Sequence, residues 1–192
     1  MGGFKLTGLA AGSASGNSLR YEQVNGVVTT AGDLLYATAA GTLTRVGIGT
    51  AGQQLRTNAG ATAPEWVSMS PITNSLSGDV ALSNTANYFT GPTVAQGTAG
   101  TWFASGTVTL VDTAGAADFH VKLWDGTTVI ASAQVTSSGA NVEVVASVSG
   151  YIASPAANIT ISVKDVTSTS GAIVFNGTGT SKDSTVSAIR IL

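Results

Sequence analysis

The stretch from Phe119 to Ala131 constrains the fold more than any other part of the chain. It reads FHVKLWDGTTVIA, so that apolar side chains alternate with others as far as Trp124. This period of two is typical of a strand with one buried face. Asp125-Gly126 favours a two-residue type I′ turn, and the β-branched run after it suits a returning strand. We therefore expect an antiparallel hairpin whose Phe119 face is buried by other parts of the chain, because an isolated hairpin is marginal in water.

Further segments of the C-terminal part have the same character. They are rich in β-branched residues and are separated by Gly, Pro, Asn and Ser turn signals, and none has a helical apolar stripe with capping residues. The candidate strands are residues 102–111, 141–148 (ending at Gly150), 159–163, 171–175 and 184–191. The expected fold class is therefore all-β, with an antiparallel β-sandwich over residues 72–192 that follows an extended or short-strand, fibre-like N-terminal region.

Residues 1–30 and 31–71 differ from this sandwich in composition. The first range is rich in Gly, Ala, Ser and Thr and buries little apolar area against itself. In the second range, glycines separate apolar segments that are too short for stable helices. Short strands of this kind gain stability by closing against copies of themselves. We expect an extended arm over 1–30 and an intertwined short-strand region over 31–71, for which the alternative is a linker without regular structure.

Charge is scarce throughout the chain. Charged residues make up 9%, the net charge is −2 and the mean hydropathy is +0.30, whereas an ordinary soluble domain carries about 25% charged residues. With so little repulsion between copies, we expect partners to cover much of the surface. The scattered basic residues lack the footprint of a nucleic-acid or anionic-lipid surface, and no apolar run reaches the roughly 18 residues of a membrane span. The absence of cysteine excludes disulfides and thiolate chemistry.

Three patterns resemble reactive or ligand-binding motifs without the context that the chemistry needs. Residues 47–52 match G-x-G-x-x-G, but no long helix follows to hold a pyrophosphate. His120, the single histidine, stands in mid-strand, where a surface or subunit-interface position is the preferred interpretation. Aspartates near strand ends offer oxygen ligands for Ca²⁺, yet without EF-hand spacing solvated loop carboxylates are preferred. These aspartates are Asp112, Asp118, Asp125, Asp165 and Asp183. We expect no cofactor, no metal and no catalytic residue.

Several segments resemble structural proteins of tailed bacteriophages. One group looks like a short connector of fibre and virion proteins, a second resembles a repeat-like fibre segment, and a third is similar to C-terminal domains of phage and prophage structural proteins. These groups are, in turn, residues 1–10 with 19–24; residues 32–36, 48–53 and 64–66; and the block from 101–103 to 122–126 with 181–185. Together they cover most of the chain.

The resemblance implies a non-enzymatic, homotrimeric virion protein with a jelly-roll C-terminal domain, like those of tumour-necrosis-factor-type and C1q-type trimers. A fibre-like part that begins at Met1 leaves no room for a separate tail-attachment domain, which favours a capsid decoration (cement) protein. Its partners would be copies of itself and the phage major capsid protein. It would be made in the host bacterial cytoplasm and located on the capsid exterior. The alternative is a trimeric tail fibre or receptor-binding tip that recognises a host surface glycan, which sugar-stacking aromatics would support.

The capsid-decoration hypothesis gives roles to apolar residues. The arm would bury its side chains across junctions between capsid subunits, and three arms together would turn weak contacts into a high effective affinity. Trp124 lies opposite the Phe119 face, so we place it in an interface rather than in the core. The residues expected to contact the capsid are Phe4, Leu6, Leu9, Leu19 and Tyr21. The residues expected at the trimer interface are Leu35, Tyr36, Leu43, Trp66 and Trp124.

Overall fold

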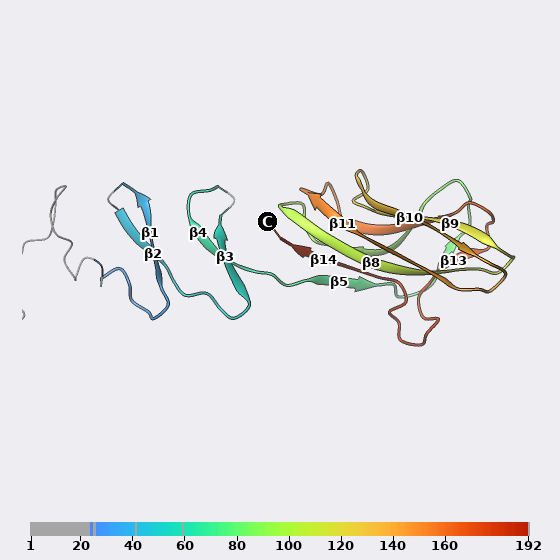
Figure 1. The fold of residues 1–192 in the computed structure, drawn as a ribbon, viewed down its shortest axis with the longest axis horizontal. Coiled ribbons are helices and arrows are strands. Elements are labelled where there is room, and N and C mark those ends of the chain that lie inside the picture. Colours follow the sequence, from blue (N-terminus) through green and yellow to red (C-terminus); the bar gives the residue numbers. More distant parts are fainter. Residues whose placement is uncertain (1–23, 25, 41, 59, 192) are drawn as a thin grey trace, which may run out of the picture. The chain divides into compact units, whose positions relative to one another are not determined.

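The computed structural model describes residues 24, 26–40, 42–58 and 60–191 and divides the chain into two compact units, Met1–Met69 and Ser70–Leu192. The regular elements of this described part are the β-strands β1 to β14 (Figure 1). Within it, no helix has the length and apolar character needed to cross a membrane. The residues expected to contact the capsid lie outside the described residues. They are Phe4, Leu6, Leu9, Leu19 and Tyr21.

The first unit contains two antiparallel ribbons of two strands each. β1 (Leu34–Ala39) pairs with β2 (Thr42–Val46), and β3 (Gln53–Thr57) pairs with β4 (Pro64–Ser68). A two-stranded ribbon is too small to enclose a core. Large apolar side chains on the ribbons therefore remain exposed by 38–43%, namely Leu34, Leu35, Leu43 and Leu55.

The second unit is a β-sandwich of two sheets. One sheet has the strand order β10-β9-β12-β7, and in the other β5, β14, β8 and β11 follow one another, with the short strands β13 and β6 beside the end of β8. Their bounds are β5 Ile72–Ser75, β6 Val80–Leu82, β7 Phe89–Val94, β8 Thr101–Asp112, β9 Ala117–Trp124, β10 Val129–Ser137, β11 Val144–Ala153, β12 Ile159–Asp165, β13 Gly171–Val174 and β14 Thr185–Arg190.

The strand pairs of the sandwich are nested. β9 pairs with β10, β8 with β11, β7 with β12 and β5 with β14, all antiparallel. A long antiparallel ribbon is thus folded over so that its strand pairs are shared between two sheets, which is the connectivity of a jelly roll. The all-β, jelly-roll fold class expected from the sequence is confirmed.

The core lies between the two sheets and comes from alternate residues of the long strands. In β9 every second residue from Ala117 to Leu123 is buried, in agreement with the predicted period of two. Burying an apolar side chain of this size contributes roughly 1.5–3 kcal/mol, so the sandwich has a core of its own. Its largest fully buried side chains include Phe119, Leu82, Leu110, Leu123, Ile159, Ile161 and Ile173.

One expected strand end is wrong. Gly150 does not terminate its strand, because β11 continues to Ala153 and pairs with β8 along its whole length. A Cβ atom at Gly150 would lie 2.7 Å from Cγ2 of Ile130. The glycine therefore lets a neighbouring side chain pass close to the strand, and does not mark a turn.

Candidate functional site: the outer faces of the sandwich

Three of the aspartates near strand ends close the turns that follow them. Asp112, Asp125 and Asp165 each accept hydrogen bonds through Oδ1 from the backbone N–H groups two and three residues further on. Such Asx turns satisfy backbone donors that the strand ladder leaves free. These carboxylates therefore have structural partners within the sandwich, and the solvated-loop interpretation is wrong for them, since all three are buried.

The turn at Asp125 also differs from the expected type. The hairpin of β9 and β10 is present, but Trp124 pairs with Val129, so that the loop between the strands has four residues. Gly126 has a φ of 90°, whereas Asp125 is not among the described residues with positive φ, which a type I′ turn would require. The Asp125 carboxylate accounts for the difference, because it also accepts the N–H of Ala156 at 2.7 Å and is held inside the fold.

Asp112 and Asp165 form a carboxyl pair inside the sandwich. They are 1% and 0% exposed, and Ser168 donates a short hydrogen bond from Oγ to Oδ2 of Asp112. Burial, and then the contact with Asp112, raises the pKa of Asp165. Burial acts against ionisation of Asp112 as well, but donors led by the Ser168 hydroxyl hold its pKa below the usual range. Each of the two groups disfavours ionisation of the other, and their enclosure keeps them away from any substrate.

The outer face of the sheet β5-β14-β8-β11 presents no charged side chain at the outward positions of these strands. Strand register aligns these positions in rows of small hydroxyl residues and one row of apolar ones. The rows are Tyr151–Phe103–Ile189, Ser149–Ser105–Ser187–Thr73 and Ser147–Thr107–Thr185–Ser75. Hydroxyls within two rows bind one another at 2.8 Å. The ammonium group of Lys182, which precedes β14, reaches the edge of this face and donates a 3.2 Å hydrogen bond to Oγ of Ser75. Away from that edge, a partner can cover the uncharged strand positions without desolvating an ion, which is the costly part of burying a polar surface.

Tyr151 is the most prominent side chain of the uncharged face. It is 67% exposed, and its ring lies 5.0 Å from that of Phe103 at an angle of 48°. Aromatic side chains of this kind are enriched at the centres of protein interfaces. The sequence alone does not pair this ring with Phe103, because β8 and β11 meet only through long-range pairing.

The outer face of the opposite sheet carries a basic-aromatic cluster, made of Tyr88, His120, Lys122, Trp124 and Lys164. Nζ of Lys122 lies 3.2 Å from the centre of the Trp124 ring and 4.1 Å from that of Tyr88. Nζ of Lys164 lies 5.3 Å from the same Tyr88 ring. The register places Lys164 opposite His120, with Trp124 on the outer face as expected. The cluster thus combines two ammonium groups with two aromatic rings.

The electrostatics of the cluster are unusual for this weakly charged chain. Burial, followed by the charge of Lys164, lowers the pKa of Lys122. The structure shows no ion pair for either lysine within the described residues. Beside the cluster lies a depression of about 310 Å³, and its lining includes Tyr88, His120, Ser132 and Gln134. The face therefore offers an aromatic ring and polar side chains around one depression, with the two ammonium groups next to its Tyr88 wall.

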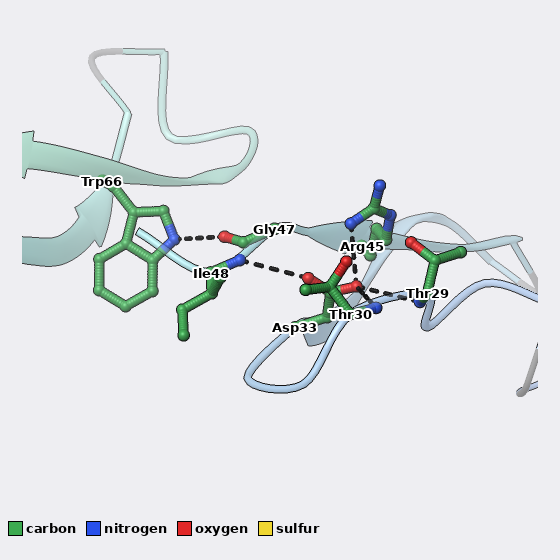
Figure 2. A network of polar contacts seen from close by, with 7 residues as sticks. All are labelled: Thr29, Thr30, Asp33, Arg45, Gly47, Ile48 and Trp66. Carbon is green, nitrogen blue, oxygen red and sulfur yellow. Dashed lines mark hydrogen bonds and ion pairs between the residues drawn. The ribbon is translucent and has the colours of Figure 1, made fainter. Parts of the chain in front are cut away.

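The first unit is organised by a separate polar network (Figure 2). Asp33 accepts hydrogen bonds from the N–H groups of Thr29, Thr30 and Ile48 and pairs with Arg45 at 2.9 Å. Burial acts against its charge, but the Thr29 and Thr30 N–H groups and the arginine hold the pKa of Asp33 below the usual range. This carboxylate therefore ties the turn before β1 to the end of β2.

Trp66 belongs to the same unit and lies against its glycines. Its Nε1 donates a 2.6 Å hydrogen bond to the carbonyl oxygen of Gly47 (Figure 2), and a Cβ atom at Gly49 would approach its ring to 2.6 Å. The second glycine of the G-x-G-x-x-G match thus allows close approach of an indole, the first accepts its hydrogen bond through the backbone, and the motif ends in a turn before β3. This packing explains the motif without a dinucleotide.

The two ribbons are each preceded by the same tripeptide, which stands within a Gly-, Ala- and Thr-rich region. Thr-Ala-Gly begins at residue 30 and again at residue 50. In both copies the glycine has positive φ, at 91° and 83°, and the N–H of the next residue bonds the threonine carbonyl at 3.1 Å. The side chain of that next residue, Asp33 or Gln53, accepts the threonine N–H. The unit is therefore a tandem of two similar turn-and-ribbon modules.

The residues expected at a trimer interface lie in both units. Leu35 and Leu43 are exposed on the first ribbon, Tyr36 is half-buried there, and Trp66 is half-buried on the second ribbon. Trp124 lies on the sandwich, half-buried, with Nε1 bonded to the hydroxyl of Ser162 at 2.8 Å. Their assignment to an interface between copies stays a prediction.

No family model matches the chain, and no curated protein matches its sequence. Among solved structures it is similar to the Eiger TNF of S. frugiperda, with 6% identity and a TM-score of 0.42, over 65% of this chain and 93% of that one. It is also similar to the PRD1 vertex protein P5, with 11% identity and a TM-score of 0.34, over 96% of this chain and 100% of that one. Scores this low carry no argument about function, and the jelly-roll assignment follows from the nested strand pairs.

Proposed function

We propose that the protein is a non-enzymatic structural component of a phage virion that assembles as a homotrimer and decorates the capsid. The main support for the proposed trimer is the outer face of the sheet β5-β14-β8-β11, whose outward strand positions are uncharged. The phage-like sequence segments support the virion setting, and the exposed leucines of the two ribbons support close association of copies along the first unit. In this proposal the capsid is bound by the arm that precedes the ribbons.

The proposed contact between copies is centred on Tyr151. An aromatic side chain buries roughly 200 Å², and this one is 67% exposed, which leaves about 130 Å² to be covered at about 25 cal/mol per Å². Complete burial would thus contribute about 3 kcal/mol per protomer, a large share of the affinity of an ordinary interface. A substitution that removes the ring should be visible as dissociation of the assembly.

Sedimentation equilibrium of the purified full chain tests the trimer. We expect a trimer for the unchanged protein and a mixture with monomer at micromolar concentration for Tyr151→Ser. Val129→Ser is the matched control, because Val129 is 53% exposed on β10, in the other sheet. A monomer before any substitution, or equal dissociation of both variants, would contradict the proposed contact.

Cosedimentation with purified capsids tests the location. Deletion of residues 1–24 is expected to abolish capsid binding while the trimer remains. A trimer that ignores capsids and binds host cells or lipopolysaccharide would instead favour the tail-fibre or receptor-binding alternative.

A further inference from the structure

We propose that the basic-aromatic cluster of Tyr88, His120, Lys122, Trp124 and Lys164 is a binding site for an anionic sugar. The acidic group, a carboxylate or a phosphate, would lie between the two lysines. The sugar ring would occupy the adjacent depression against Tyr88. The proposal uses the sheet opposite to Tyr151, and it requires that Trp124 faces a ligand and not, as predicted from the sequence, a neighbouring copy.

The charge arrangement is the first argument. Lys122 and Lys164 approach the same Tyr88 ring, at 4.1 and 5.3 Å from its centre. Their like charges repel each other, and the structure gives neither of them a carboxylate partner within its described part. Asp118, on the same face of β9, is engaged by the Thr136 hydroxyl at 2.5 Å. An anion bound between the lysines would relieve the repulsion and form charge-assisted hydrogen bonds with both.

The preorganisation of Lys122 is the second argument. Its ammonium group lies 3.2 Å from the centre of the Trp124 ring, and that ring is fixed by the hydrogen bond to Ser162. A lysine held in this way has little side-chain entropy left to lose when a ligand binds. Its partial desolvation also strengthens attraction to an anion, since charges interact more strongly away from water.

The shape and lining of the depression indicate a sugar and not a bare ion. Its volume of about 310 Å³ exceeds the needs of a small inorganic anion and lies at the lower end of the range for small-molecule pockets. Tyr88 is 37% exposed and lines the depression. Ser132 and Gln134, both exposed on β10, offer the mixed donors and acceptors that bind sugar hydroxyls.

Binding is measured on the full-length protein by calorimetry and by tryptophan fluorescence. The probes are a galacturonic acid trisaccharide, the neutral galactose trisaccharide, glucose 6-phosphate and inorganic phosphate. We expect saturable binding of the galacturonate or of the sugar phosphate, which identifies the acidic group as carboxylate or phosphate. The neutral sugar and inorganic phosphate should each bind at least about tenfold more weakly, because each lacks one half of the contacts.

Lys164→Gln is the principal variant, since Lys164 is less enclosed by rings than Lys122. It should weaken binding about tenfold, the effect of losing a hydrogen bond to a charged group, and Tyr88→Leu should do the same. Lys182→Gln removes an equal charge from an exposed lysine elsewhere and should leave affinity unchanged. Thermal unfolding of each variant verifies that it is folded.

Four results would overturn the proposal. They are no binding of any probe at millimolar concentration, equal binding of the neutral trisaccharide, inorganic phosphate binding as tightly as the sugars, and equal loss in Lys164→Gln and Lys182→Gln. A fluorescence change that persists in Trp124→Phe would place the ligand elsewhere and would also contradict it. Failure of trimer formation or of capsid binding has no bearing on these outcomes, so the two proposals fail separately.

Discussion

Substitution of Asp165 by asparagine is a sharp test of the buried carboxyl pair. Oδ1 of Asp165 is satisfied by two backbone N–H groups, but its buried Oδ2 has no hydrogen-bond partner in the described part of the chain. Asparagine retains the accepting oxygen and places an NH₂ group where Oδ2 stood, so that it can donate to Asp112. An unsatisfied buried polar atom costs about 1–3 kcal/mol. We therefore expect Asp165→Asn to raise the free energy of unfolding at pH 7 by about this amount.

The pH dependence gives this prediction its sign. The pKa of Asp165 is raised in the folded state above its ordinary value of 3.8. The folded protein thus binds this proton more tightly than the unfolded chain does. The resulting stabilisation is complete below that ordinary value and is lost as pH rises through the folded-state pKa. Asparagine does not titrate, so the gain of the variant over the unchanged protein should grow between acid and neutral pH.

Urea unfolding at a series of pH values, followed by near-ultraviolet circular dichroism, measures the effect. Asp112→Asn is the control: it removes the member of the pair whose pKa is lowered, and with it the acceptor of the Ser168 hydroxyl, so it should destabilise the protein at neutral pH. If Asp165→Asn unfolds at lower urea than the unchanged protein at pH 7, the unsatisfied Oδ2 of Asp165 does not carry the cost described.

The remaining predictions concern the frame of the sandwich. Gly106→Ala would drive a Cβ atom into a backbone oxygen of β14 and should lower the free energy of unfolding by about 3 kcal/mol. Gly78 has open space around it, so Gly78→Ala should have no measurable effect in the same urea titration. Asp125→Ala leaves buried backbone N–H groups without an acceptor and should cost about 1–3 kcal/mol at pH 7. Although burial works against its charge, backbone donors lower the pKa of Asp125. The difference in unfolding free energy between the variant and the unchanged protein should therefore shrink as pH falls below 3.8. A constant difference down to about pH 3 would contradict the role of the Asp125 carboxylate as the acceptor.

The strands of the sandwich could be predicted from the sequence because their signal is local. Alternation from Phe119 to Leu123 places every second side chain in the core whatever the topology, and the β-branched runs in β8, β12 and β14 behave in the same way. The geometry of the turns was harder to predict from the sequence. Asp125 looked like the first residue of a tight turn, but its acceptor role depends on Ala156, which is close only in the folded chain.

The candidate sites could not be predicted from the sequence, because strand pairing brings their residues together. Lys122 and Lys164 are ordinary exposed-face residues of two strands until pairing of β9 with β12 sets them around one tyrosine. The row of Phe103 and Tyr151 likewise depends on the register between β8 and β11. Register is a long-range property, so no motif in the linear sequence specifies either group. The expected interface residues were chosen by apolar character alone, which finds exposed anchors such as Leu35 but not their neighbours.

The tandem Thr-Ala-Gly modules have a consequence for how such a protein changes over generations. Each module has a glycine turn directly before its ribbon and a strand ladder of its own, so a copy of about twenty residues could be gained or lost as a unit. The jelly roll, with its separate core, would fold as before. The length of the first unit is thereby open to change by whole modules.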